Sequence, residues 1–188
     1  MFMFDIETGG IESTSVVLSA AIIHFTLQED FTYQDLLDRA CFVKFDAAEQ
    51  IKKYKRVTDK GTLEWWEKQG KHARELSLIP GPIDYDVEEG MVKLRGYYKN
   101  TPVADNNRTI WVRGSLDQLA IDSLTRAAGC GDLGHYTAYR DVRTAIDLLC
   151  ETASNGYCDV PGFDKSQVIK HDPIHDCAYD IMMMRYGK

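Results

Sequence analysis

The stretch FMFDIETGG, residues 2–10, decides the fold. Its apolar residues indicate a buried strand, and Gly9-Gly10 indicates the turn that ends it. Asp5 and Glu7 are two residues apart, so both side chains leave the same face of the sheet. Apolar neighbours on both sides indicate a central strand, where buried carboxylates are costly without a metal or a partner. A solvated strand end is the alternative for this acidic pair taken alone.

The remaining pattern predicts an α/β fold. Apolar runs at 16–27 and 40–45 follow the first strand through short connections, which predicts an antiparallel meander of three strands. Two strand–turn–helix units come later. We therefore expect a single domain over residues 1–188, with a mixed sheet of three antiparallel strands plus parallel strands, flanked by helices. The later strands are expected at 109–113 and 136–139, and the helices at 63–69, 87–98, 115–128, 141–152 and 173–185.

The composition is that of an ordinary globular domain, with 188 residues and 44% hydrophobic residues. A chain of this length buries about 70% of its unfolded surface, so any metal is expected to be catalytic rather than structural. Five widely spaced cysteines and the lack of a basic leader predict reduced thiols in a cytoplasm. Ser19 interrupts the longest apolar run, so we expect a soluble protein with no membrane partner.

The formal net charge of −7 argues against a broad basic surface that grips long nucleic acid. Contact with a nucleic acid would have to be limited to a few terminal nucleotides and a local basic patch. Residues 52–56, KKYKR, are the candidate patch. A solvated loop or helix face is the alternative interpretation of this run.

Two further places carry candidate chemistry. Asp117 is expected in the first turn of a helix, where the helix dipole alone would favour a carboxylate. The segment HDPIHDCAYD, residues 171–180, offers two histidine–carboxylate pairs. Asp172 and Pro173 form a good helix start, which leaves His171 in a loop and fixes Asp176 on the helix. We therefore select the pair His171 and Asp176.

The other pair in this segment is His175 with Asp180. Both residues are expected within the helix, five positions apart and so roughly 140° apart around its axis. They should point away from each other. We expect them to be surface residues or residues that support the site.

The motifs in order resemble the DEDDh (DnaQ-like) 3′–5′ exonucleases, which have an RNase H-like fold. FDIETG at 4–9 is similar to the first exonuclease motif, GSLD at 114–117 to the second and the segment 171–176 to the third, with His171 marking the DEDDh branch. EWW at 64–66 and RDVRT at 140–144 resemble the exodeoxyribonuclease A group of T-even bacteriophages. One departure is Arg113, where many members have Asn.

The resemblance implies a two-metal mechanism. Two Mg²⁺ or Mn²⁺ ions would be held by Asp5, Glu7, Asp117 and Asp176, and oxygen ligands suit these hard ions. Asp5 would bridge the ions, and His171 would take the proton from the attacking water. The residues expected to contact substrate are Thr8, Gly9, Trp65, Arg113, Ser115 and Arg140.

Some of these residues have a second interpretation. Trp65 and Trp66 point about 100° apart on a helix, so at least one is expected in the core. Core packing is favoured for Trp65, and stacking on a base is the alternative. Arg140 and Asp141 are expected to cap the following helix, although Arg140 is a candidate for phosphate contact.

The resemblance also implies a substrate and a place of action. The expected partner is a nucleic-acid 3′ end, with single-stranded DNA favoured, and the expected products are nucleoside 5′-monophosphates. The enzyme would be phage-encoded and act in the bacterial host cytoplasm. RNA is the main alternative substrate, and a binding module that has lost catalysis is the alternative from another class. The oligomeric state is left open.

Overall fold

One mixed sheet forms the centre of the computed structural model, which describes residues 1–104 and 108–188. The strand order is β3-β2-β1-β4-β5. β1 pairs antiparallel with β2, and β2 pairs antiparallel with β3, whereas β1–β4 and β4–β5 are parallel pairs. This confirms the predicted meander plus parallel strands of an RNase H-like α/β fold. The strands are β1 (Phe2–Thr8), β2 (Val17–His24), β3 (Cys41–Lys44), β4 (Ile110–Val112) and β5 (Tyr139–Asp141).

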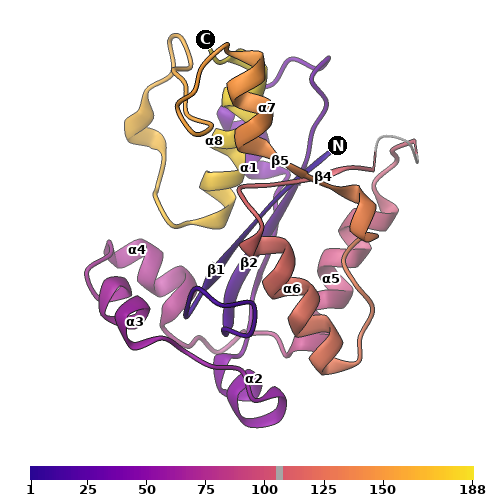
Figure 1. Cartoon of the computed structure of the whole chain (residues 1–188), viewed down its shortest axis with the longest axis vertical. Helices are drawn as coiled ribbons and strands as arrows, with labels where there is room; N and C mark the ends of the chain where they lie inside the picture. The colour runs from indigo at the N-terminus through magenta and orange to yellow at the C-terminus, as the bar shows by residue number, and fades with distance from the viewer. Residues whose placement is uncertain (105–107) are drawn as a thin grey trace.

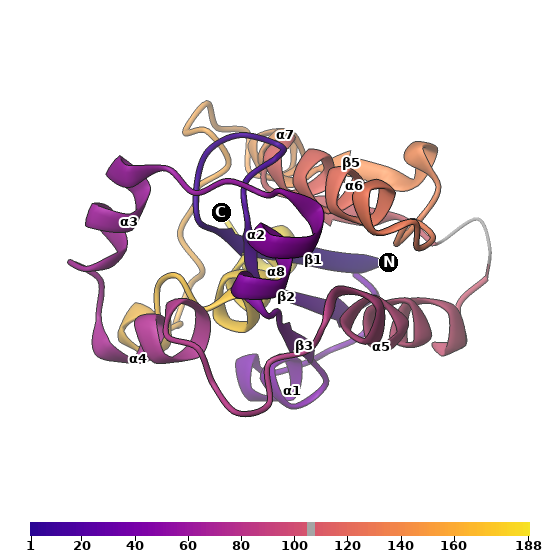
Figure 2. The same cartoon turned by 90° about the horizontal axis from the view of Figure 1, so that it is seen from below.

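Helices cover both faces of this sheet. α5 and α6 lie on one face, and α1, α7 and α8 lie on the other (Figures 1 and 2). α3 and α4 gather near the end of β1, far from the N-terminus (Figure 1). No helix in the described chain is long and apolar enough to cross a membrane. The α-helices are α1 (Tyr33–Asp38), α2 (Ala47–Tyr54), α3 (Lys60–Trp66), α4 (Lys71–Ala73), α5 (Val87–Asn100), α6 (Leu116–Ala128), α7 (Val142–Leu149) and α8 (Pro173–Tyr186).

The alternation along β1 sets the position of the carboxylates. Phe2, Phe4 and Ile6 are buried in the core beneath α5 and α6. Met3 is buried in the opposite core, which includes residues of α8. Because side chains alternate across a strand, Asp5 and Glu7 follow Met3 onto the α8 side. Both carboxylates of the central strand therefore lie on the side of the sheet that α8 covers.

Aspartates begin several of the predicted helices. Asp59, Asp141 and Asp172 accept hydrogen bonds from the backbone N–H groups of Thr62, Thr144 and Ile174. Pro173 occupies the first helical position of α8. These are standard capping interactions, which satisfy amide groups that the helix leaves unpaired. The predicted starts of α7 and α8 are confirmed, whereas α3 begins at Lys60 and ends at Trp66, three residues before each expected boundary at 63 and 69.

Other predicted boundaries were wrong. The connection between β2 and β3 contains the short helix α1, whose start is fixed by a capping box of Thr32 and Asp35. Residues 136–138 form a 3₁₀ turn, η3, and the strand β5 follows it. The side chain of His135 caps this turn by accepting from the Thr137 N–H, which shifts the strand toward the C-terminus. α7 ends at Leu149 instead of continuing to residue 152.

The basic run 52–56 is not one exposed patch. α2 ends at Tyr54, and Arg56 is 4% exposed. The Arg56 guanidinium donates to the carbonyl oxygens of Ser13 and Ser15 and to the Ser123 hydroxyl. A buried guanidinium needs such acceptors, so Arg56 ties the loop after β1 to α6. The expectation of a five-residue surface patch was therefore wrong at Arg56.

Candidate active site

Three elements bring the predicted carboxylates together. β1 supplies Asp5 and Glu7, the first turn of α6 supplies Asp117, and the first turn of α8 supplies Asp176. A cavity of about 570 Å³ is lined by Asp5, Glu7, Asp176 and His171. The side chain of Asp117 is buried, and its charge raises the pKa values of Asp5 and Glu7.

The carboxylates are held at an electrostatic cost. Burial, and then the charges of Asp117, Asp176 and Glu7, raise the pKa of Asp5 well above its usual range. Burial, followed by the charge of Asp180, raises the pKa of Asp176 to about 7. Burial raises the pKa of Asp117 to about 8. Such a group of like charges strongly favours a bound cation.

The donor set fits divalent metal ions. Ligand atoms of Glu7, His171 and Asp176 all lie within 4.8 Å of one another. The Oδ2 atom of Asp117 is buried and has no hydrogen-bond partner in the described chain. An unpaired buried carboxylate oxygen is expensive, and a metal ion is one partner that would satisfy it. Carboxylate oxygens are the ligands that Mg²⁺ and Mn²⁺ prefer.

His171 stands at the edge of the carboxylate cluster. Its Nδ1 atom is 4.0 Å from Glu7 Oε1, and its backbone N–H donates to Asp176 Oδ2 at 3.1 Å. Its φ of 62° lies in the left-handed region, which residues other than glycine rarely adopt. Burial, and then the charge of Lys170, lower the pKa of His171. The imidazole is therefore kept neutral and able to accept a proton.

The two tryptophans of α3 divide their roles. Trp66 is fully buried, and its indole N–H donates to the Thr8 carbonyl oxygen at 2.9 Å. Trp65 is 40% exposed, and its ring meets the His171 ring edge-on with centroids 4.6 Å apart. The expectation that Trp65 packs in the core was therefore wrong. Trp66 is the core residue, and Trp65 is open to the site.

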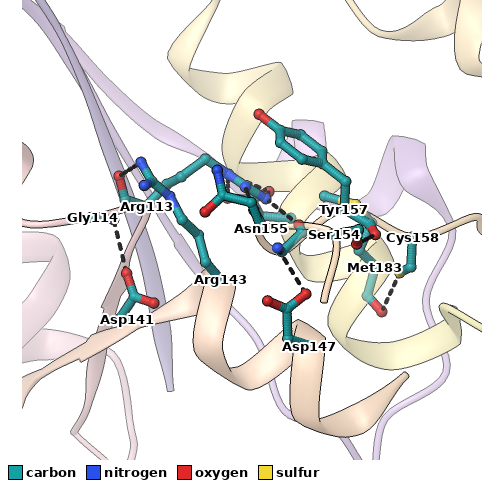
Figure 3. Close-up of polar contacts among 12 residues, drawn as sticks. Arg113, Gly114, Asp141, Arg143, Asp147, Ser154, Asn155, Tyr157, Cys158 and Met183 are labelled. Carbon is teal, nitrogen blue, oxygen red and sulfur yellow. Dashed lines mark hydrogen bonds and ion pairs between the residues drawn. The ribbon is translucent and has the colours of Figure 1, made fainter. Parts of the chain in front are cut away.

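Arg113 is occupied by protein partners. Its guanidinium pairs with Asp180, with Nη2 2.5 Å from Oδ1, and donates to the Gly156 carbonyl oxygen at 2.9 Å. It also lies over the Tyr157 ring, 4.4 Å from the centroid. Figure 3 shows Arg113 and Arg143 gathered beside the loop that carries Asn155 and Tyr157. Asp180 is buried and supports the site, so the surface alternative for it was wrong.

The second motif makes a sharp turn before Asp117. Gly114 has a φ of 91°, and a Cβ at this position would lie 2.9 Å from Arg143 Nη2. Its N–H donates to Asp141 Oδ2 at 3.0 Å. Ser115 is exposed at the start of α6, and its side chain makes no capping hydrogen bond. Glycine is therefore required for the turn that places Asp117.

Arg140 is not brought to the carboxylate cluster. It is exposed on β5, and its guanidinium donates to the carbonyl oxygens of Thr137 and Tyr139 at 2.7 Å. It lines a separate apolar groove with Trp111 and Leu148. The other predicted residues near the site are Thr8, which lines a neighbouring cavity with Trp65, and Gly9, which is buried next to Thr8.

Sequence reasoning missed several residues that line the carboxylate cavity. These are Tyr157, Lys165, Lys170 and Tyr179. Lys165 is paired with Asp159 at 2.7 Å, whereas Lys170 has no ion-pair partner among the described residues. The position of Lys170 directly before His171 was a signal that could have identified it.

Comparisons with known proteins agree with this arrangement. A family model described as the 3′–5′ exoribonuclease Rv2179c-like domain matches residues 1–187. The exodeoxyribonuclease of Enterobacteria phage T4 is 29% identical, and the match covers 99% of this chain and 88% of that protein. The predicted resemblance to DnaQ-like exonucleases is confirmed, and the chain is a nuclease. It belongs to the DnaQ-like family of the 3′–5′ exoribonuclease Rv2179c-like domain.

Proposed function

We propose that the protein is a two-metal 3′–5′ exodeoxyribonuclease that releases nucleoside 5′-monophosphates from DNA 3′ ends. The observation that carries the proposal is the cluster of Asp5, Glu7, Asp117 and Asp176, whose pKa values are all raised, beside a neutral His171. A binder without catalysis has no need for four costly buried or partly buried carboxylates and a histidine at one cavity.

The carboxylates would hold two Mg²⁺ or Mn²⁺ ions. When bound, such ions supply Lewis-acid stabilisation of the attacking and leaving oxygens of a phosphodiester. Asp5 and Glu7 come from one rigid strand and Asp176 from a helix that packs against it, so the ligands are held in place before substrate arrives. Unpaired Asp117 Oδ2 leaves one ligand position free for this purpose.

His171 would act as the general base. Its neutral imidazole accepts a proton from the water that attacks phosphorus, the bond from phosphorus to the 3′ oxygen breaks, and the leaving oxygen takes a proton from solvent. The products are a nucleoside 5′-monophosphate and a chain shorter by one nucleotide with a free 3′-hydroxyl. His171 returns its proton to water through its exposed side, because a third of the side chain, 34%, is accessible.

The terminal nucleotide would enter the cavity next to Glu7. This cavity of about 440 Å³ is lined by Thr8, Ile11 and Trp65. Gly9 follows Thr8 but is buried, and its N–H and C=O groups are hydrogen-bonded to Val16 and Asp59, so we leave it out of the proposed contacts. The unpaired Lys170 would contact a phosphate, and the exposed Ser115 hydroxyl is open to a second contact. Arg113 and Arg140 have protein acceptors, so we leave them out of the proposed contacts.

The sugar preference rests on the comparisons. The T4 relative is named an exodeoxyribonuclease and matches nearly the whole chain, whereas the family model is described as an exoribonuclease. We favour DNA on the first of these, with RNA as the second candidate. Metal chemistry at phosphorus is nearly the same for both, so a contact to the 2′-hydroxyl would have to discriminate between them.

Digestion of 5′-labelled single-stranded DNA and matched RNA tests the proposal. Wild type is compared with Asp5→Ala, His171→Ala and the control His135→Ala, which changes an exposed histidine outside the cavity. We expect a Mg²⁺- or Mn²⁺-dependent ladder that shortens from the 3′ end, is abolished by EDTA and is lost in the first two variants only. Absence of cleavage with either ion would overturn the proposal of an enzyme and would favour the alternative of a binding module that has lost catalysis.

A further inference from the structure

Asp172, the residue after the proposed base, joins segments that are far apart in the sequence. It is 3% exposed, and its Oδ2 atom lies 2.9 Å from His72 Nε2 of α4. The same oxygen is 3.8 Å from His175 Nε2 of α8. Its other oxygen caps α8 by accepting from the Ile174 N–H at 3.0 Å. One buried carboxylate therefore connects α4, the loop that carries His171, and α8.

His175 contacts the loop on one side of its ring and Asp172 on the other. The Ile169 N–H donates to His175 Nδ1 at 3.4 Å. The Tyr33 hydroxyl lies 2.8 Å from the same nitrogen. The other ring nitrogen, Nε2, faces Asp172 at 3.8 Å. His175 thus holds the loop at Ile169, before His171, and at Asp172, after it.

His171 depends on this support. Its left-handed backbone conformation is unfavourable for a residue with a Cβ and persists only where surrounding contacts impose it. Its own N–H is bound to Asp176, and its ring meets Trp65. Trp65 and His72 both belong to the segment of α3 and α4, so this segment contacts the loop at two points. Figure 1 shows α4 beside the loop that leads into α8.

We infer that His72 and His175, acting through Asp172, are positioning residues that hold His171 in the geometry needed for proton transfer. This inference rests on the proposed function. Among the described residues, His72 makes a side-chain hydrogen bond to Asp172 and none to the carboxylates on β1 and α6, so its loss should leave metal binding unchanged. Loss of His72 should instead lower the rate of the chemical step, because a small displacement of a catalytic group lowers the rate without altering ground-state binding.

His72→Ala is the test, because the His72 side chain is 54% exposed and its removal leaves no buried cavity. We expect the single-turnover cleavage rate to fall about tenfold. The Kd for Mn²⁺, measured by calorimetry, and the Kd for DNA should stay within about twofold of wild type. His72→Gln should restore most of the rate, because its amide N–H can replace the Nε2 donor. The matched control His135→Ala should behave as wild type.

A double-mutant cycle separates positioning from a general structural effect. In the His171→Ala background, His72→Ala should cause no further loss of rate, because the group that it positions is absent. An equal loss in both backgrounds, or an unchanged rate in His72→Ala, would overturn the inference while the metal-dependent activity of wild type still upheld the proposed function. Failure of wild type to cleave DNA or RNA would overturn both.

Discussion

Asp176→Asn tests whether the carboxylate cluster stores electrostatic repulsion when no metal is bound. The amide has nearly the same shape, and its oxygen can still accept the hydrogen bond from the His171 N–H. Burial and the charge of Asp180 raise the pKa of Asp176 to about 7 in the folded protein. In an unfolded chain the pKa of an aspartate is about 3.9.

The sign follows from these two pKa values. Because the folded value is the higher one, the contribution of Asp176 to stability is complete below about pH 4 and is lost as the pH rises through about 7. Between about pH 5 and pH 8 the wild type should lose about 3 kcal/mol that the asparagine variant keeps. For a chain of this size, the Tm of the variant minus the Tm of wild type should therefore be roughly 5–10 °C larger at about pH 8 than at about pH 5.

Thermal unfolding followed by circular dichroism in EDTA checks this prediction at both pH values. The exposed Asp30→Asn variant is the control, and its difference from wild type should not change with pH. Adding Mn²⁺ at about pH 8 should reverse the order, because wild type gains binding energy that the variant has lost. A gap between Asp176→Asn and wild type that is the same at both pH values would refute the assignment of repulsion to this residue.

Three further predictions concern the reaction. His171→Ala should lower the single-turnover rate about 10²–10⁴-fold while calorimetry shows an unchanged Kd for Mn²⁺, and a weakened Kd would mean that the imidazole is a ligand instead of a base. Lys170→Ala should lower the magnitude of the slope of log K against log[salt] for DNA binding by about 1, whereas Lys170→Arg should keep it; equal slopes would remove Lys170 from the phosphate contacts. Trp65→Ala should weaken binding of single-stranded DNA by about 1–3 kcal/mol in fluorescence anisotropy. A loss of binding no larger than that of the exposed control Tyr136→Ala would argue against stacking.

The central part of the fold could be predicted because local chain geometry determines it. Alternation on β1 identified both the core face and the acidic face, and Asp172-Pro173 identified the start of α8. The short elements were missed for the opposite reason. α1 has only six residues, and β5 was displaced by a turn that the His135 side chain caps. Periodicity over so few residues does not separate a helix, a turn and a strand.

The features of the site likewise fall into those that the sequence predicts and those that it does not. Strand alternation and helix starts, which the sequence displays, predicted where Asp5, Glu7, Asp117 and Asp176 lie, and the resemblance to the DnaQ-like exonucleases selected them as one set. The partner of Arg113 is 67 residues away, and no spacing rule connects it to Asp180. Which tryptophan of α3 is buried depends on how that helix lies against Thr8. These contacts are set by tertiary packing, so they needed the structure.

The acidity of the chain and its proposed polyanionic substrate can be reconciled at the cavity. Two divalent cations carry as much positive charge as the four clustered carboxylates carry negative charge, so metal loading would neutralise the cluster. The chain would still be acidic overall, since its formal net charge is −7. Among the cations that line the cavity, Arg113 and Lys165 are already paired within the protein, and Lys170 is left for substrate. Attraction would then act only near the cavity, which suits an enzyme that binds a chain end and not the length of a duplex. The salt dependence of DNA binding should accordingly be shallow and should lose much of its slope when Lys170 is removed.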